Sequence, residues 1–270
     1  MSRAKTTQDF LDSDIIDIQE LLCLALDCSK SSLYTNPNHK ISAVELANLD
    51  VLIQKRESGE PFAYLSGSKG FYHLNFKVTT DTLIPRPETE LLIDIALKLF
   101  EPNESIKVLD LGTGSGIIAI TLADKCANWQ VNATDQSIAA LEVAKENARK
   151  AMAGIEFSHG SWFDAVPSQS FNLIISNPPY VESNDPHLKD LQFEPIEALI
   201  SGADGLDDIR LIIEQAPKRL DSGGYLLLEH GHNQQREIMR FMRQSFTEVR
   251  GFQDNNGVDR AVLGKLNSCV

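Results

Sequence analysis

A short apolar segment that runs directly into a glycine-rich turn constrains the fold of this chain more than any other feature. The apolar segment covers residues 108–111, and the turn, Gly-Thr-Gly-Ser-Gly, covers residues 112–116. Because glycines let the backbone turn tightly and approach a ligand closely, the pattern is typical of a buried strand that leads through a binding turn into a helix. Apolar strand-like segments recur at 129–133, 171–175 and 225–228, with helical spacing between them. This alternation predicts βαβ units and a mostly parallel sheet covered on both faces.

The first part of the chain has a different pattern. Apolar residues between Phe10 and Leu26 are spaced as one face of a helix. Ser42 and Glu45 form a capping box that begins another helix, and Gly59 is placed to end it. Residues 72–78 alternate between apolar and polar side chains, as expected of a half-buried strand in a connecting hairpin.

These patterns predict an α/β protein with two domains. We expect a helical N-terminal domain with a hairpin linker over residues 1–80 and an α/β domain over residues 81–270. A hydrophobic content of 42% in 270 residues is enough for buried cores of this size.

Composition also excludes several classes of protein. No apolar run approaches the roughly 20 residues that span a bilayer, and residues 1–20 lack the pattern of a secretion signal. The four cysteines, Cys23, Cys28, Cys126 and Cys269, form no CxxC pair, which argues against a zinc site or a disulfide framework. We therefore expect a cytoplasmic protein with no membrane association.

The net charge of -13 bears on the choice of partner. An acidic protein gains little from phosphate neutralisation, which drives most binding to nucleic acids. We expect no direct binding to DNA.

The glycine-rich turn and a later carboxylate predict a nucleotide-like cofactor. Asp135 ends the second predicted strand, at about the twenty-residue distance where ribose hydroxyls are held in nucleotide-binding βαβ units. The turn alone is also compatible with NAD, with FAD or with a simple tight bend. Asp110 before the turn, together with the absence of a second nucleotide-binding half, favours S-adenosylmethionine.

An aromatic residue follows the third predicted strand. Trp162 stands in the segment 160–163, where a flat ring could contact an adenine. Tryptophan is usually largely buried, so a plain core position is the equally weighted alternative.

The motif Asn177-Pro178-Pro179-Tyr180 follows a buried strand, at the edge where open α/β sheets bind ligands. Two prolines fix the backbone and remove N–H donors, which leaves carbonyls free to accept hydrogen bonds. If the Asn177 side-chain oxygen and the Pro178 carbonyl accept the two N–H bonds of a planar amide or amino group, its nitrogen is aimed for methylation without a strong base. Tyr180 would stack on the flat face of the acceptor, the alternative being a buried tyrosine beside a turn.

Taken together, these motifs resemble those of the bacterial and organellar protein-glutamine N5-methyltransferases that act on class I release factors. The resemblance covers nearly the whole chain. Beside the glycine turn and the Asn-Pro-Pro-Tyr motif, it rests on Ile-Pro-Arg-Pro-Glu-Thr-Glu at 84–90, Phe-Glu-Pro at 193–195 and Leu-Leu-Glu-His-Gly at 227–231.

The resemblance implies a Rossmann-like class I methyltransferase domain with a seven-stranded sheet whose last strand is antiparallel, and a helical N-terminal domain that helps to bind the substrate. It implies that S-adenosylmethionine is converted to S-adenosylhomocysteine, and that a release factor is methylated on the glutamine of its Gly-Gly-Gln motif, in translation termination. We expect the protein to be a monomer.

The residues that the resemblance assigns fall into two groups. Those implied to contact the cofactor are Gly112, Thr113, Gly114, Ser115, Gly116, Asp135, Trp162 and Asn177. Those implied to hold the glutamine are Asn177, Pro178, Pro179 and Tyr180, of which Asn177, Pro178 and Tyr180 are the expected catalytic residues.

Two other functions are compatible with parts of the sequence. An adenine-N6 nucleic-acid methyltransferase shares the Asn-Pro-Pro-Tyr motif, but the acidic charge and the lack of a target-recognition segment argue against it. An inactive cofactor-binding adaptor would not need both Asn177 and Tyr180. Glu229, His230 and His232 are read as structural rather than as metal ligands, because no third well-placed ligand accompanies the histidines.

Overall fold

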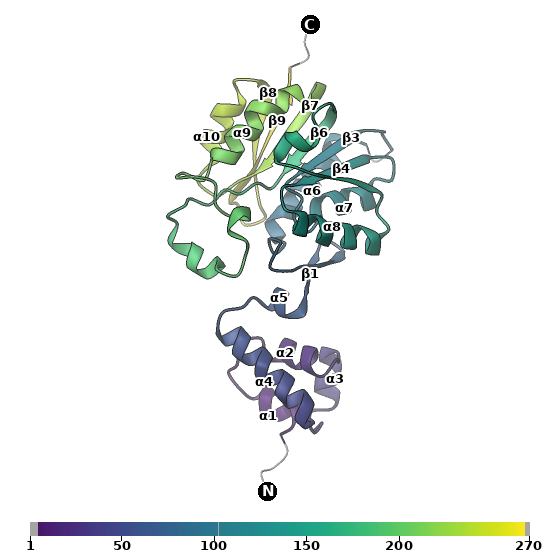
Figure 1. Ribbon diagram of the computed structural model, residues 1–270, viewed down its shortest axis with the longest axis vertical. Coiled ribbons are helices and arrows are strands. Elements are labelled where there is room, and N and C mark those ends of the chain that lie inside the picture. Colours follow the sequence, from purple (N-terminus) through teal and green to yellow (C-terminus); the bar gives the residue numbers. More distant parts are fainter. Residues whose placement is uncertain (1–4, 102, 268–270) are drawn as a thin grey trace. The chain divides into compact units, whose positions relative to one another are not determined.

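A computed structural model of the chain describes residues 5–101 and 103–267. Cys269 lies outside the described residues. Residues 1–4, the start of the segment considered as a secretion signal, also lie outside them. The chain divides into two compact units between Gly67 and Ser68 (Figure 1). Each unit has its own hydrophobic core.

The first unit is helical. Within the described residues its helices are α1 (Thr7–Leu11), α2 (Ile18–Ala25), α3 (Lys30–Thr35), α4 (Ala43–Glu57) and α5 (Phe62–Ser66). Their apolar faces meet in a core that includes Leu21, Leu22, Leu33 and Leu49.

The single helical face expected between Phe10 and Leu26 is divided between α1 and α2. The hydroxyl of Ser13 donates to the carbonyl of Phe10 at 2.6 Å, at the end of α1. Asp17, just before α2, has a left-handed φ of 56°. Aspartate and serine form such local turns readily, so the intervening residues leave the helix.

The start of α4 is the predicted capping box. The N–H of Glu45 donates to the Ser42 hydroxyl at 3.3 Å, and the N–H of Ser42 donates to the Glu45 carboxylate at 2.7 Å. Gly59 follows the helix with a φ of +97°, which glycine adopts without strain. Both predicted ends of this helix are confirmed.

The second unit begins with an antiparallel hairpin, β1 (Ser68–Phe71) and β2 (Leu74–Lys77). Tyr72, expected in a strand, lies in the two-residue turn with a φ of 55°. Phe71 and Phe76 are buried in the core of the second unit. The contacts therefore group the hairpin with the α/β part of the chain, whereas the sequence patterns group it with the helical part, over residues 1–80.

The described part of the second unit contains one large sheet of seven strands, in the order β5-β4-β3-β6-β7-β9-β8. The strands are β3 (Lys107–Leu111), β4 (Gln130–Asp135), β5 (Ile155–His159), β6 (Phe171–Ser176), β7 (Leu220–Glu229), β8 (Phe246–Gln253) and β9 (Asp259–Leu266). Strands β3 to β7 run parallel, and β9 is antiparallel to both of its neighbours. The predicted mostly parallel sheet with a reversed last strand is confirmed.

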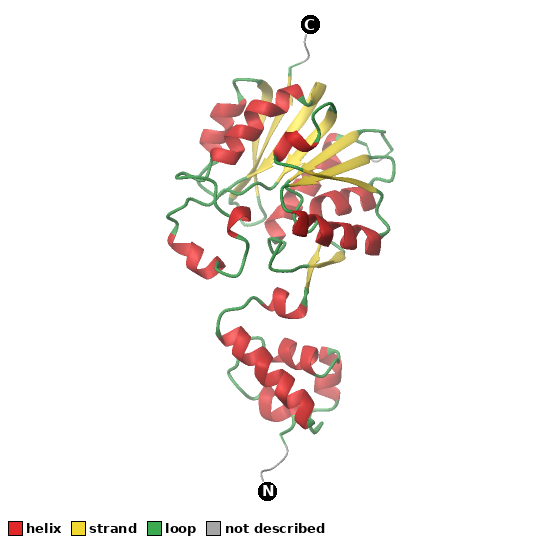
Figure 2. Cartoon of the chain, in the orientation of Figure 1, coloured by secondary structure: helices red, strands yellow, loops and turns green. Residues whose placement is uncertain are grey.

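Helices cover both faces of this sheet (Figure 2). They are α6 (Glu90–Leu99), α7 (Ile117–Lys125), α8 (Ile138–Ala151), α9 (Asp207–Gln215) and α10 (Gln235–Met242), with short 3₁₀ turns at Pro87–Thr89, Trp162–Ala165, Pro186–Leu191, Ile196–Ala198 and Ala216–Lys218. Alternate strand residues face opposite cores: Val108 packs with the side chains of α6 and α7, and Leu109 packs with those of α9 and α10. This two-faced burial is why the strands read as continuous apolar runs in the sequence.

Candidate active site

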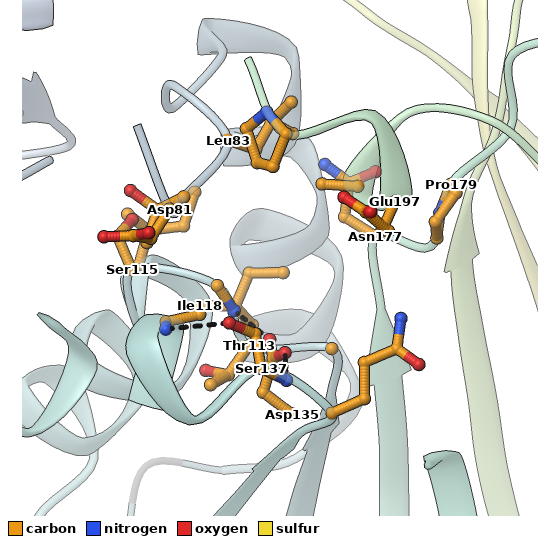
Figure 3. A pocket seen from close by; sticks show the side chains of 18 of the residues that line it. Asp81, Leu83, Thr113, Ser115, Ile118, Asp135, Ser137, Asn177, Pro179 and Glu197 are labelled. Atoms are coloured by element: carbon orange, nitrogen blue, oxygen red, sulfur yellow. Dashed lines mark hydrogen bonds between the residues drawn. The ribbon is translucent and has the colours of Figure 1, made fainter. Parts of the chain in front are cut away.

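The carboxyl ends of four neighbouring parallel strands meet at one edge of the sheet. Gly112 follows β3, Asp135 ends β4, Trp162 follows β5 and Asn177 follows β6. All four residues line one cavity of about 650 Å³. Figure 3 shows Thr113 and Asp135 on one side of this cavity and Asn177 on another. A cavity of this size is typical of a small-molecule site, and open α/β sheets bind their ligands at this edge.

Asp110 stabilises the glycine-rich turn from the core side. This fully buried carboxyl accepts a hydrogen bond from the Thr113 hydroxyl at 2.6 Å and one from the N–H of Ala119 at 3.1 Å. Burial raises the pKa of Asp110 to about 7. Asp110 therefore fixes the turn from the core rather than contacting a ligand.

Two glycines of the turn are required for different reasons. Gly114 has a φ of +55°, and a side chain there would project into open space. Gly116 has a φ of +87°, and a Cβ at that position would lie 2.7 Å from Cδ1 of Ile120. The first glycine keeps the ligand side of the turn open, and the second lets α7 begin close to its neighbours.

Asp135 joins the turn to the next strand. One carboxylate oxygen accepts the N–H of Gly114 at 2.9 Å, and the other accepts the N–H of Ser137 at 2.8 Å. Burial raises the pKa of Asp135, while these backbone donors act in the opposite direction. A carboxylate has about four acceptor sites and the backbone N–H of Gln136 approaches it as well, so acceptor capacity remains for a ribose hydroxyl.

Trp162 lies against both the core and the cavity. Its indole N–H donates to Asp208 at 3.2 Å, and Asp208 in turn accepts the Ser201 hydroxyl at 2.6 Å. The ring also approaches the turn, because a Cβ on Gly112 would lie 3.3 Å from it. Trp162 therefore lies partly in the core and partly at the cavity, so the core position and the ligand-contacting position each describe part of its environment.

Asn177 presents an unused acceptor. Its side-chain N–H donates to the Thr89 hydroxyl at 3.3 Å. Its side-chain oxygen is buried and has no hydrogen-bond partner among the residues that the structure describes. A buried acceptor without a partner costs free energy unless a ligand supplies a donor.

The prolines and Tyr180 of the motif occupy different positions. Pro179 lines the cavity with Asn177, whereas Pro178 is buried. Tyr180 is half-buried against the core, and its hydroxyl donates to Glu229 at 3.3 Å. Burial raises the pKa of Tyr180. In this conformation neither Tyr180 nor Gly116 lines the cavity.

Several residues at this edge were not singled out from the sequence. Thr89 touches Asn177, and Gln136 and Ser137 line the cavity beside Asp135. The buried Glu194 accepts the N–H of Ile84 at 2.9 Å and also pairs with Arg86, which joins the loop after β6 to the segment before α6. The motifs that contain Thr89 and Glu194, at 84–90 and 193–195, indicate the family in the sequence but do not indicate that these residues lie at the site.

The residues present fit S-adenosylmethionine. The cavity combines an open glycine turn, a carboxylate that is able to bind a ribose and the edge of an indole, which are groups suited to the amino-acid, sugar and adenine portions of that molecule. The described residues contain no cluster of three or more His, Cys, Asp or Glu side chains placed to hold a metal ion. None of the described helices is both long enough and apolar enough to cross a membrane.

Solved structures share the fold. A methyltransferase from Pyrococcus furiosus matches with a TM-score of 0.57 and 19% identity, over 80% of this chain and 100% of its own. A 16S rRNA N2 G1207 methyltransferase from T. thermophilus, solved with AdoMet and guanosine, matches with a TM-score of 0.56 and 16% identity, over 74% of this chain and 50% of its own. At these identities the similarity establishes the fold alone.

Sequence relatives establish the family. Residues 89–204 match the family model described as methyltransferase small domain, and residues 5–67 match the PrmC N-terminal domain. The release factor glutamine methyltransferase of Coxiella burnetii is 40% identical over 93% of this chain and 91% of its own length. That of Vibrio cholerae is 42% identical over 95% and 91%, respectively. The chain therefore belongs to the release factor glutamine methyltransferase family and is an S-adenosylmethionine-dependent methyltransferase.

Proposed function

We propose that this enzyme methylates the side-chain amide nitrogen, N5, of the glutamine in the Gly-Gly-Gln motif of class I peptide-chain release factors. The observation that carries the proposal is the buried, unpartnered side-chain oxygen of Asn177, a residue that lines the cavity. A carboxamide N–H is the donor that this oxygen lacks. The relatives from Coxiella burnetii and Vibrio cholerae, which are release factor glutamine methyltransferases, support the same substrate.

Positioning is the main contribution that the acceptor motif makes in this proposal. An amide nitrogen is a poor nucleophile because its lone pair is delocalised. The Asn177 oxygen and the Pro178 carbonyl would accept its two N–H bonds and turn the nitrogen toward the methyl donor. Fixing two reactants in a near-attack geometry contributes about 7 to 11 kcal/mol, whereas one neutral hydrogen bond contributes only about 1 kcal/mol.

The other side of the cavity would hold the cofactor, which supplies a methyl group on a sulfonium sulfur. We assign the turn over residues 112–116 to its amino-acid portion, Asp135 to the ribose hydroxyls and Trp162 to the adenine. The open space at Gly114 and the remaining acceptor capacity of Asp135 support these assignments. Tyr180 would reach the acceptor only by turning its ring away from the position seen here.

The helical unit and the cellular setting complete the proposal. The match of residues 5–67 to the PrmC N-terminal domain supports a role for this unit in binding the release factor. Release factors act in translation termination, so we place the enzyme in the cytoplasm.

Mass spectrometry of a release factor tests the proposal directly. The purified factor is incubated with the enzyme and the methyl donor, digested and mapped for added methyl groups. The proposal expects one methyl group, on the glutamine of the Gly-Gly-Gln motif, and none on a factor in which that glutamine is replaced by alanine. Methylation at another residue, or none at all, would contradict it.

A nucleic-acid substrate is tested in the same assay. A duplex and a single-stranded oligonucleotide, both containing adenine, are incubated with enzyme and donor in parallel. The net charge of -13 favours no transfer to either. Transfer to adenine with none to the release factor would replace the proposed function with the adenine-N6 alternative.

A further inference from the structure

Trp162 has an unusual backbone conformation for a residue that lines the cavity. Its φ is +43°, in the left-handed region, where a bulky side chain is a rare outlier. The residue begins a 3₁₀ turn, Trp162–Ala165, shortly after β5. Such a conformation costs free energy and persists only where surrounding contacts compensate for it, as they do at many ligand-binding sites. The contacts of the indole ring therefore show what holds this residue in place.

Asp208, at the start of α9, holds the polar end of the ring. The indole N–H of Trp162 donates to Oδ1 of Asp208 at 3.2 Å, and the two residues lie 46 positions apart in the chain. The direction of this hydrogen bond is fixed, because an indole N–H is a donor only. Asp208 lines the cavity together with Trp162, so the bonded pair forms part of the cavity wall.

Ser201 in turn fixes the side chain of Asp208. The backbone N–H of Asp208 donates to the Ser201 hydroxyl oxygen at 2.8 Å, and the hydroxyl donates to Oδ2 of Asp208 at 2.6 Å. Ser201 is almost completely buried. Each carboxylate oxygen of Asp208 thus has its own partner, Trp162 on one side and Ser201 on the other. These two bonds restrict rotation of the carboxylate and so fix the acceptor that the indole uses.

The far edge of the ring lies against the glycine-rich turn. A Cβ on Gly112 would lie 3.3 Å from Cζ3 and 3.7 Å from Cη2 of Trp162, the two ring atoms most distant from the indole nitrogen. The ring is therefore held at one end by Asp208 and bounded at the other by the backbone of Gly112. Contacts at both ends restrict the tilt of the ring plane as well as its rotation.

We infer that Asp208, fixed by Ser201, is a positioning residue for donor binding, which holds the indole of Trp162 in the orientation that receives the adenine. Asp208 acts through the ring and does not need to touch the donor. A ring that is already oriented raises the affinity, because binding does not have to order it. The inference rests on the proposed assignment of Trp162 to the adenine, but the restraint on the ring is a property of the enzyme alone.

Calorimetry of S-adenosylmethionine binding to matched variants tests the role. Asp208→Leu keeps the approximate shape but removes the acceptor, so Kd should rise about tenfold. Asp208→Asn loses the charge but keeps an oxygen for the indole N–H, so Kd should stay within about threefold of the wild type. The control Asp207→Leu removes the neighbouring carboxylate of α9, which does not line the cavity, and should change Kd by less than about twofold.

A double-mutant cycle separates an effect through the ring from a direct contact with the donor or a general loss of structure. Trp162→Phe has no N–H for Asp208 to hold. If Asp208 acts through the ring, adding Asp208→Leu to Trp162→Phe should change Kd by less than about twofold. An equal loss from Asp208→Leu in both backgrounds would overturn the inference. Wild-type affinity in Asp208→Leu, or Asp208→Asn as impaired as Asp208→Leu, would also overturn it.

Fluorescence provides a measurement that requires no donor. Trp129 and Trp162 are the two tryptophans of the chain, so Trp129→Phe leaves Trp162 as the single emitting indole. In this background the fast component of the time-resolved anisotropy should about double in amplitude in Asp208→Leu, because the ring moves more freely, and should not in Asp208→Asn. Equal decays in both variants would overturn the inference.

These measurements distinguish the inference from the proposals on which it builds. Unchanged donor affinity in Trp162→Phe would remove the assignment of the ring to the adenine, and with it the role of Asp208 in binding. Failure of the wild type to methylate a release factor would remove the proposed substrate and would alter none of the expected affinities or decays. The calorimetric cycle uses the natural Trp129, so it decides the inference even where Trp129→Phe fails to fold.

Discussion

The Glu194 carboxylate accepts the backbone N–H of Ile84 at 2.9 Å and so connects two segments that lie 110 residues apart in the chain. The same carboxylate pairs with Arg86. Glu194 is buried, whereas about a third of the Arg86 side chain is exposed. The loop that follows β6 and carries the Asn-Pro-Pro-Tyr motif is thereby held against the segment before α6.

Replacement of Glu194 should loosen this connection. Glu194→Ala leaves the N–H of Ile84 without a partner and removes a partly screened ion pair, so we expect a loss of about 1–3 kcal/mol in the free energy of unfolding. Glu194→Gln keeps an acceptor oxygen and should lose less. Urea unfolding of both variants measures the difference. Equal stability of Glu194→Ala and the wild type would show that the connection contributes nothing.

Asp135 should contribute directly to donor binding. Hydrogen bonds to a charged group contribute about 1.5–3 kcal/mol, so Asp135→Ala should weaken binding of S-adenosylmethionine by about ten- to a hundredfold. Asp135→Asn keeps an oxygen and should show a smaller loss. Calorimetry gives the affinities, and circular dichroism checks that each variant is folded. Wild-type affinity in a folded Asp135→Ala would remove the assignment to the ribose.

Substitutions at Gly114 and Gly116 should have different effects, mainly on donor binding at Gly114 and mainly on stability at Gly116. Gly116→Ala forces a Cβ to within 2.7 Å of Ile120 Cδ1 at a positive φ, so we expect a loss of stability of about 2–4 kcal/mol. Gly114→Ala meets open space and should lose only about 1 kcal/mol, through backbone strain, while weakening donor binding. Thermal unfolding and calorimetry measure the two effects. The reverse ranking in stability would contradict the geometry of the turn.

Glu229 should make stability depend on pH. It lies among Thr89, Tyr180, Arg260 and Glu88, and burial is the main cause that raises its pKa from 4.5 to about 7. Between these values the folded protein holds a proton that the unfolded chain has released. The free energy of unfolding therefore falls, by on the order of 1 kcal/mol per pH unit from this group, as the pH rises through that window.

Glu229→Gln removes this dependence because glutamine does not ionise. The stability of the variant relative to the wild type should rise steadily between about pH 5 and pH 7 and level off above. Urea unfolding of both proteins across this range gives the difference at each pH. A difference that stays constant with pH would mean that the carboxyl is ionised throughout.

Much of the fold followed from local patterns in the sequence. The buried strands were predicted because parallel strands covered on both faces are apolar along their length, as in β6, where Leu173, Ile174 and Ile175 are fully buried. The break between α1 and α2 and the turn at Tyr72 were not predicted. At both places local hydrogen bonds or a left-handed backbone residue override an apolar spacing that would suit a continuous element.

The site was predicted less completely than the fold. Asp135, Trp162 and Asn177 follow strands of one parallel sheet, so their meeting at one edge could be expected from the sequence. The hydrogen bond between Thr89 and Asn177 joins residues 88 positions apart, at the start of α6 and after β6, and no local pattern reports such a contact. The position of Tyr180 against the core has the same cause, since Glu229 draws its hydroxyl inward.

The rate of methyl transfer by Asn177→Ala shows whether the Asn177 oxygen holds the acceptor amide. The variant and the wild type are compared at saturating donor, with the release factor as acceptor and the product glutamine identified by mass spectrometry. If the Asn177 oxygen holds the acceptor amide, kcat at saturating donor should fall by about a hundredfold or more, whatever the change in donor affinity. A kcat within about twofold of the wild type would contradict the account.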